Sequence, residues 1–127
     1  MARILVCEDD VVFQELVRTV LAKDGHEITC VDGGNQALSA IAREPFDLLV
    51  TDIVMPDKDG LETIREIRSK RSELPVLAMT SGLPNLKAEF LKAASALGAD
   101  GVIQKPFKAS DLRAQVTALL GMRSSRA

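Results

Sequence analysis

The chain has 127 residues, of which 46% are hydrophobic, and a formal net charge of −2. This length suits one compact domain, and the even charge balance argues against a basic surface for nucleic acid or an anionic membrane. Because no apolar run approaches the ~18 residues of a membrane span and the N-terminal residues have no signal-peptide layout, we expect a cytoplasmic domain.

Short apolar runs, which predict strands, alternate five times with segments of helical period. We expect the strands at residues 3–7, 28–31, 47–51, 76–79 and 101–103. In the first intervening segment the apolar residues recur every three or four positions, which predicts one apolar helix face that ends before Gly25. The residues of that face are Val12, Phe13, Leu16, Val17, Val20 and Leu21.

The second and third helices follow the same pattern. The second begins after the turn at Asp32 and ends before Pro45, and the third carries Ile64 and Ile67 on its apolar face. A basic run belongs to the third helix, and we expect it on the solvated side because glutamates interleave with it. The run consists of Arg65, Arg68, Lys70 and Arg71.

Two more helices complete the pattern. One is expected between Pro84 and Gly98, since proline suits a first helical turn and glycine a helix end. Ser110 is a good N-cap for the last helix, and we expect that helix to end at Gly121.

Strands that read as near-continuous apolar runs are buried on both faces. Helices between successive strands imply a parallel sheet with right-handed crossovers. No linker, low-complexity stretch or internal repeat marks a second domain. The sequence therefore predicts a single α/β domain around a five-stranded sheet.

Polar residues follow four of these strands directly. Ligands of open parallel sheets bind outside the carboxyl ends of the strands, so these side chains share one crevice if their strands are neighbours. The residues are Glu8, Asp9 and Asp10 after the first strand, Asp52 after the third, Thr80 after the fourth and Lys105 after the fifth.

Clustered carboxylates need a counter-charge. Two of them about 4 Å apart repel by roughly 4 kcal/mol at an effective dielectric near 20. Oxygen ligands without His or Cys nearby favour Mg²⁺ or Mn²⁺ over Zn²⁺. Lys105 and the Thr80 hydroxyl offer a phosphoryl group a charge and a hydrogen-bond donor, and Asp52 can act as the nucleophile. This set indicates phosphoryl transfer onto a carboxylate.

The chain resembles the receiver domain of two-component response regulators, the fold of the bacterial chemotaxis response regulator. The resemblance covers about residues 3–120 and depends on five pieces in order: residues 4–10, 34–38 and 52–60, Thr80, and residues 105–107. It implies a doubly wound, flavodoxin-like fold with strand order 2-1-3-4-5 and five helices. Residues 1–121 would form the receiver domain and residues 122–127 a short basic tail.

The resemblance also implies roles for the site residues. Asp52 matches the acceptor of a phosphoryl group from phosphohistidine on a sensor histidine kinase or a histidine phosphotransfer protein. Glu8 and Asp9 match the acidic pair that holds Mg²⁺, with Asp52 and the backbone carbonyl of Val54 as further ligands. Thr80 matches the switch hydroxyl. Lys105, whose bond to the following proline is commonly cis in the family, matches the phosphate-binding lysine.

This sequence departs from the family pattern at three places. Val102 stands where the family usually has a switch aromatic residue, three positions before the lysine. The segment from Thr80 to Gly98 is about three residues longer than expected, which indicates a distinct loop at residues 81–84. Neither Val54 nor Gly82 has a side chain that can hold a water molecule, so we expect slow self-dephosphorylation.

The resemblance implies a regulatory domain rather than an enzyme, with output through a downstream protein that binds the face of helix 4, strand 5 and helix 5. We expect a monomer or a weak dimer. A pseudo-receiver that serves as a docking scaffold without phosphorylation is an alternative, because of Val102. An aspartyl-phosphate phosphatase of the haloacid dehalogenase type would need an acid in place of Val54. A flavodoxin-type electron carrier would place its phosphate against Glu8, Asp9 and Asp10.

Overall fold

The computed structural model describes residues 2–53, 60–80, 92 and 98–126. Five parallel strands form one sheet in the order β2-β1-β3-β4-β5, which confirms the predicted doubly wound topology. The strands are β1 (Arg3–Cys7), β2 (Glu27–Val31), β3 (Leu48–Asp52), β4 (Val76–Thr80) and β5 (Gly101–Gln104). Each lies within two residues of its predicted bounds.

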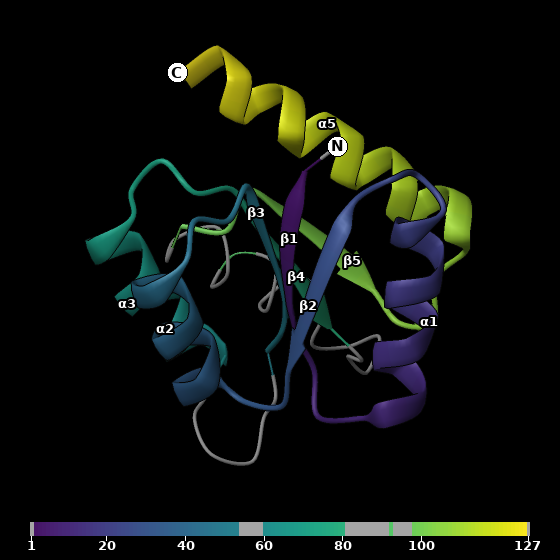
Figure 1. Cartoon of the computed structure of the whole chain (residues 1–127), viewed down its shortest axis with the longest axis horizontal. Coiled ribbons are helices and arrows are strands. Elements are labelled where there is room, and N and C mark those ends of the chain that lie inside the picture. The colour runs from purple at the N-terminus through teal and green to yellow at the C-terminus, as the bar shows by residue number, and fades with distance from the viewer. Residues whose placement is uncertain (1, 54–59, 81–91, 93–97, 127) are drawn as a thin grey trace.

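Helices cover both faces of the sheet. Those in the described part of the chain are α1 (Val11–Ala22), α2 (Gly34–Arg43), α3 (Gly60–Lys70) and α5 (Ala109–Arg126). Helices α1 and α5 lie on one side of the sheet, and α2 and α3 on the other (Figure 1). The predicted fourth helix falls on residues 84–97, which lie outside the described residues apart from position 92.

The core is divided by the sheet into two apolar layers. Alternate residues of a strand point to opposite faces, so the three central strands supply both layers. On the α1 and α5 side, Val6 and Val50 pack with Leu21 and Leu112, whereas on the other side Leu5, Leu49 and Ala78 pack with Ala37, Ile64 and Ile67. The apolar interior thus holds the carboxyl ends of β1, β3 and β4 in a fixed relation.

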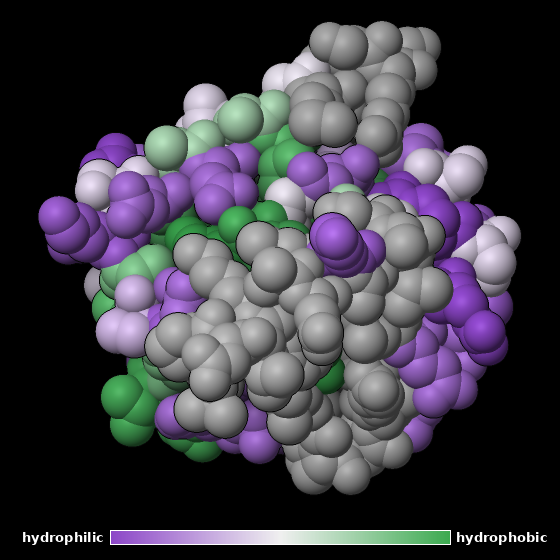
Figure 2. Space-filling model, turned by 180° about the vertical axis from the view of Figure 1, so that it is seen from behind, coloured by the Kyte–Doolittle hydropathy of each residue, from purple (hydrophilic) through white to green (hydrophobic). Residues whose placement is uncertain are grey.

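The buried stripe of α1 is narrower than predicted. Val17, Val20 and Leu21 are buried, but Val12 is 79% and Leu16 44% exposed. Both exposed residues lie beside the stripe of Phe13, Val17 and Val20, which packs against the core, so they form the flank of the predicted face. Apolar surface is visible on the side of α1 in the view from behind (Figure 2).

Helix α5 differs from the prediction at both ends. It begins at Ala109, so Ser110 lies inside the first turn, and the Lys108 carbonyl accepts from the N–H groups of Asp111 and Leu112 at 3.0 and 3.2 Å. The helix continues past Gly121 to Arg126. A glycine costs a helix only about 1 kcal/mol relative to alanine, which is too little to end it. The division at residue 121 stays a prediction.

The basic run of α3 is only partly solvated, contrary to the prediction. The Arg68 guanidinium donates to the carbonyls of Ser72 and Leu74, at 2.7 and 2.8 Å, to the Gly98 carbonyl and to Asp100 Oδ2 at 2.8 Å. Arg71 donates to the Ile41 carbonyl at 2.9 Å. Arg68 thus binds carbonyls of the segments before β4 and β5, and Arg71 binds a carbonyl in the last turn of α2. The interleaved charges in the sequence do not reveal these contacts.

None of the helices in the described part of the chain combines the length and the apolar character of a membrane span.

Candidate functional site

The carboxyl ends of the strands bring the predicted site residues to one edge of the sheet. Glu8 follows β1, Asp52 ends β3, Thr80 ends β4 and Lys105 follows β5. Three of these side chains are nearly buried: Glu8 is 0% exposed, and Asp52 and Thr80 are each 6% exposed. Asp9 and Asp10 are exposed. The parallel topology predicted this convergence, because it sends every strand toward the same edge.

Three carboxylates form the centre of the site. One oxygen from each of Glu8, Asp9 and Asp52 lies within 4.8 Å of the other two. Two of the three side chains are buried and Asp9 is exposed, so the cluster has a side open to solvent. An oxygen-only set of this kind can hold a divalent cation. The carbonyl of Val54, which the resemblance implies as a further ligand, lies outside the described residues.

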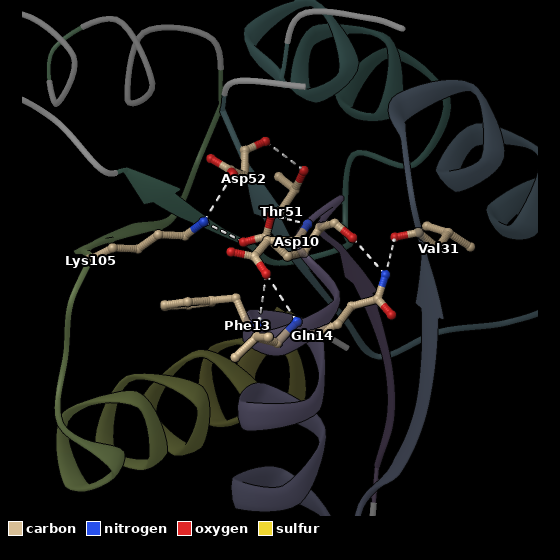
Figure 3. A network of polar contacts seen from close by, with 9 residues as sticks. Asp10, Phe13, Gln14, Val31, Thr51, Asp52 and Lys105 are labelled. Atoms are coloured by element: carbon tan, nitrogen blue, oxygen red, sulfur yellow. Dashed lines mark hydrogen bonds and ion pairs between the residues drawn. The ribbon is translucent and has the colours of Figure 1, made fainter. Parts of the chain in front are cut away.

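The Lys105 ammonium balances part of this negative charge. Its Nζ donates to Asp52 Oδ2 at 2.9 Å and to Glu8 Oε1 (Figure 3). Burial disfavours the charged lysine, but the hydrogen bonds and charges of Glu8 and Asp52 outweigh it and raise the pKa of Lys105. Burial raises the pKa of Glu8 despite the lysine. One cation thus serves two buried carboxylates.

An aromatic pair borders the lysine. The ring centroid of Phe13 lies 4.4 Å from Lys105 Nζ, and the Phe13 and Phe107 rings meet edge to face with centroids 5.3 Å apart. The sequence pattern assigns Phe13 to the apolar helix face and does not predict this contact. The contact between the Lys105 ammonium and the Phe13 ring depends on how α1 and the residues after β5 pack together. The periodicity of the sequence does not show this packing.

Asp10 and Gln14 support the loop that carries the acids. Asp10 caps α1, because its Oδ1 accepts from the N–H groups of Val12 at 2.9 Å and Phe13 at 3.4 Å. The Gln14 amide donates to the carbonyls of Glu8 (2.6 Å) and Val31 (3.4 Å) (Figure 3). Sequence reasoning missed Gln14, since a polar residue in a helix carries no signal of its partners.

Val102, which stands where the family usually has an aromatic residue, lies near Thr80. Pairing of β4 with β5 places Val102 opposite Ala78 and Gln104 opposite Thr80. A groove of about 520 Å³ lies between β5 and α5, and its walls include Thr80, Val102, Phe107 and Gln115. Val102 and Thr80 therefore border the same groove. Gly82 and residues 81–84 lie outside the described residues.

The chain is similar to proteins of one family. A family model of the response regulator receiver domain matches residues 4–117. Response regulator MprA of Mycobacterium leprae is 37% identical over 118 residues, which cover 93% of this chain and 50% of MprA. The chain thus spans about half the length of the curated relatives it matches.

Solved structures agree with this. NtrX from Brucella abortus has a TM-score of 0.90 and 34% identity, over 98% of this chain and 28% of that one. The response regulator protein TrrA from Thermotoga maritima, solved in complex with Mg(2+)-BeF, has a TM-score of 0.83 and 31% identity, over 94% of this chain and 99% of that one. This chain belongs to the family of response regulator receiver domains.

Proposed function

We propose that this domain is a phosphorylation-dependent switch in which Asp52 accepts a phosphoryl group from a phosphohistidine donor. The donor would be a sensor histidine kinase or a histidine phosphotransfer protein. The observation that carries the proposal is the convergence of Glu8, Asp9 and Asp52 within 4.8 Å of one another, with Lys105 bonded to two of them. A nucleophile, a cation site and a fixed positive charge then occupy one edge of the sheet.

Asp52 suits in-line attack on phosphorus. Its carboxylate would form the new oxygen–phosphorus bond while the nitrogen–phosphorus bond of the donor breaks and the electron pair stays on the imidazole, which takes up a proton. The result is an acyl phosphate, and the remaining task of the protein is to place and stabilise the negative oxygens. A side chain that is only 6% exposed is protected from competing water.

Mg²⁺ is the cation that the site fits best, and Mn²⁺ is the nearest substitute. When bound, it would neutralise charge on the phosphoryl oxygens. Glu8, Asp9 and Asp52 would hold it, with the Val54 carbonyl as a further proposed ligand. Two observations support this choice: the ligand atoms are all hard oxygens, and the related TrrA structure contains Mg(2+)-BeF.

Lys105 and Thr80 would act on the product. A phosphoryl group on Asp52 replaces one negative charge by about two, which draws the Lys105 ammonium from the carboxylates to a phosphoryl oxygen. The Thr80 hydroxyl, at the end of the next strand, would donate to another oxygen. Movement of Thr80 changes the groove that it lines together with Val102, and this change would reach a downstream protein partner.

The test is the intact mass of the protein after incubation with acetyl phosphate, with and without Mg²⁺. We expect a metal-dependent gain of one phosphoryl group in the wild type and in Asp32→Asn, and no gain in Asp52→Asn. Asp32 is the matched control because it also follows a strand but interacts with Gln14 and Gln36. An equal gain in Asp52→Asn, or no gain in the folded wild type, contradicts the proposal.

A further inference from the structure

We propose that Phe13 is a positioning residue for Lys105, whose ring holds the ammonium over the site while the carboxylates are engaged elsewhere. This inference rests on the proposed function and concerns a residue outside the acidic motif. Its basis is the 4.4 Å separation between Lys105 Nζ and the ring centroid of Phe13 (Figure 3). A cation this close to an aromatic face is attracted by the ring quadrupole, and more so where water is excluded.

The lysine needs such a support because its stem is flexible. Four methylene groups connect the charge of Lys105 to the backbone, and freezing them loses rotamer entropy. The side chain is nevertheless only 12% exposed, and the ammonium is held from three directions: by Glu8, by Asp52 and by Phe13. A side chain fixed by several contacts can lose one of them and keep its place.

The ring is itself fixed. Phe13 lies in the first turn of α1, where its N–H is bound by the Asp10 cap at 3.4 Å. On the other side its ring meets Phe107 edge to face, at an interplanar angle of 89°. Phe107 is two residues after Lys105, so the same segment that presents the lysine also packs against the ring that receives it. Helix α1 and the residues after β5 are thereby joined at the site.

The ring contact is the one that the proposed reaction leaves intact. Glu8 serves a cation in that reaction and cannot then pair fully with Lys105. Asp52 loses a carboxylate oxygen to the phosphoryl group. The Phe13 face competes with neither event, because it binds only the ammonium. It therefore keeps Lys105 above Asp52 through the interval in which both ion pairs weaken.

A spectroscopic measurement tests the contact directly. An aromatic ring shifts the NMR resonances of protons above its face upfield, so the terminal methylene of Lys105 should resonate upfield of free lysine, both without metal and with saturating Mg²⁺. We expect Phe13→Tyr to keep this shift and Phe13→Leu to abolish it. A Lys105 resonance at the free-lysine position in the Mg²⁺-loaded wild type overturns the proposal.

The kinetic test compares initial rates of phosphorylation by acetyl phosphate at saturating Mg²⁺. Loss of a desolvated cation–ring contact should slow Phe13→Leu by about threefold to tenfold, and Phe13→Tyr should recover the wild-type rate. The matched control is Phe46→Leu, which removes a buried ring that lies 5.2 Å from the Arg3 guanidinium carbon, at the amino ends of the strands. It should lower stability and leave the rate unchanged.

The outcomes separate this inference from the proposed function. Equal rates in Phe13→Leu and the wild type refute the positioning role and leave Asp52 as the acceptor. If the wild type takes up no phosphoryl group, the proposed function fails, and the NMR shift alone decides whether the ring holds the lysine. Should Phe13→Leu not fold, Phe13→Met provides the flexible apolar replacement for both measurements.

Discussion

Three consecutive acids at the end of β1 have different environments. Glu8 is fully buried and bonded to Lys105, Asp9 is exposed at the open side of the cluster, and Asp10 caps α1. A uniform acidic run thus supplies a buried carboxylate, an exposed carboxylate and a helix cap.

The cap gives a prediction at the residue scale. Replacing Asp10 by alanine should lower the free energy of unfolding by about 1 kcal/mol, because two N–H groups of the first turn lose their acceptor. Asp10→Asn keeps an acceptor oxygen and should lose much less. Urea denaturation measures both, and an equal loss in the two variants would show that charge, not capping, is the contribution of Asp10.

The side chains whose place at the sheet edge was predicted and those whose contacts were missed differ in the kind of information they need. Glu8, Asp52 and Lys105 each end an apolar run, so the one-dimensional pattern together with parallel topology is enough to bring them to one edge. The partners of Phe13 and Gln14 depend on which side chains meet across elements. Periodicity places these two residues on α1 and says nothing of what they contact.

At the scale of elements, a few polar side chains connect helices to the sheet. Arg68 joins the end of α3 to the residues before β4 and before β5, and Asp100 Oδ2 also accepts from the Val76 N–H at 2.9 Å. Gly98, with φ of +112°, passes so close that a Cβ there would lie 2.9 Å from Arg68 Nε. Glycine is therefore favoured at this position for two reasons: it adopts the positive φ without strain, and it has no Cβ to collide with the Arg68 guanidinium.

A second connection ties α5 to the residues after α1 and predicts a pH dependence. Arg113 donates to both carboxylate oxygens of Asp24, at 2.9 and 2.7 Å, and this hydrogen bonding lowers the pKa of Asp24. A carboxyl whose pKa is lower in the folded state stabilises the fold above its ordinary pKa, and the contribution disappears as the pH falls through the lowered value.

Arg113→Gln should therefore be less stable than the wild type near neutral pH. The difference in unfolding free energy should shrink as the pH falls below the ordinary range of an aspartate carboxyl. The pair is exposed, so we expect a small effect. The control is the same substitution in an Asp24→Asn background, where no pH-dependent difference should remain. A difference that persists in strong acid would mean that Arg113 acts through packing instead.

At the scale of the whole molecule, the sheet and its two apolar layers were predictable and one boundary was not. Near-continuous apolar strands and intervening helical periods predict a parallel sheet with helices on both faces, whereas the strand order came from the family resemblance. The end of α5 was placed wrongly at Gly121, because the small helix penalty of a glycine is easily offset by the residues around it. The width of a buried helix stripe was also not predictable, because Val12 is exposed while Phe13 beside it packs against the core.

The central claim is that the phosphoryl group is carried by the Asp52 carboxylate as an acyl phosphate. Borohydride reduction converts an acyl phosphate on aspartate to homoserine and leaves phosphate esters of serine and threonine unchanged. The decisive measurement is peptide sequencing by mass spectrometry after phosphorylation with Mg²⁺ and reduction. We predict homoserine at position 52, in proportion to the phosphoryl group gained. Homoserine at another aspartate position would contradict the account. A phosphate ester without homoserine at any position would contradict it as well.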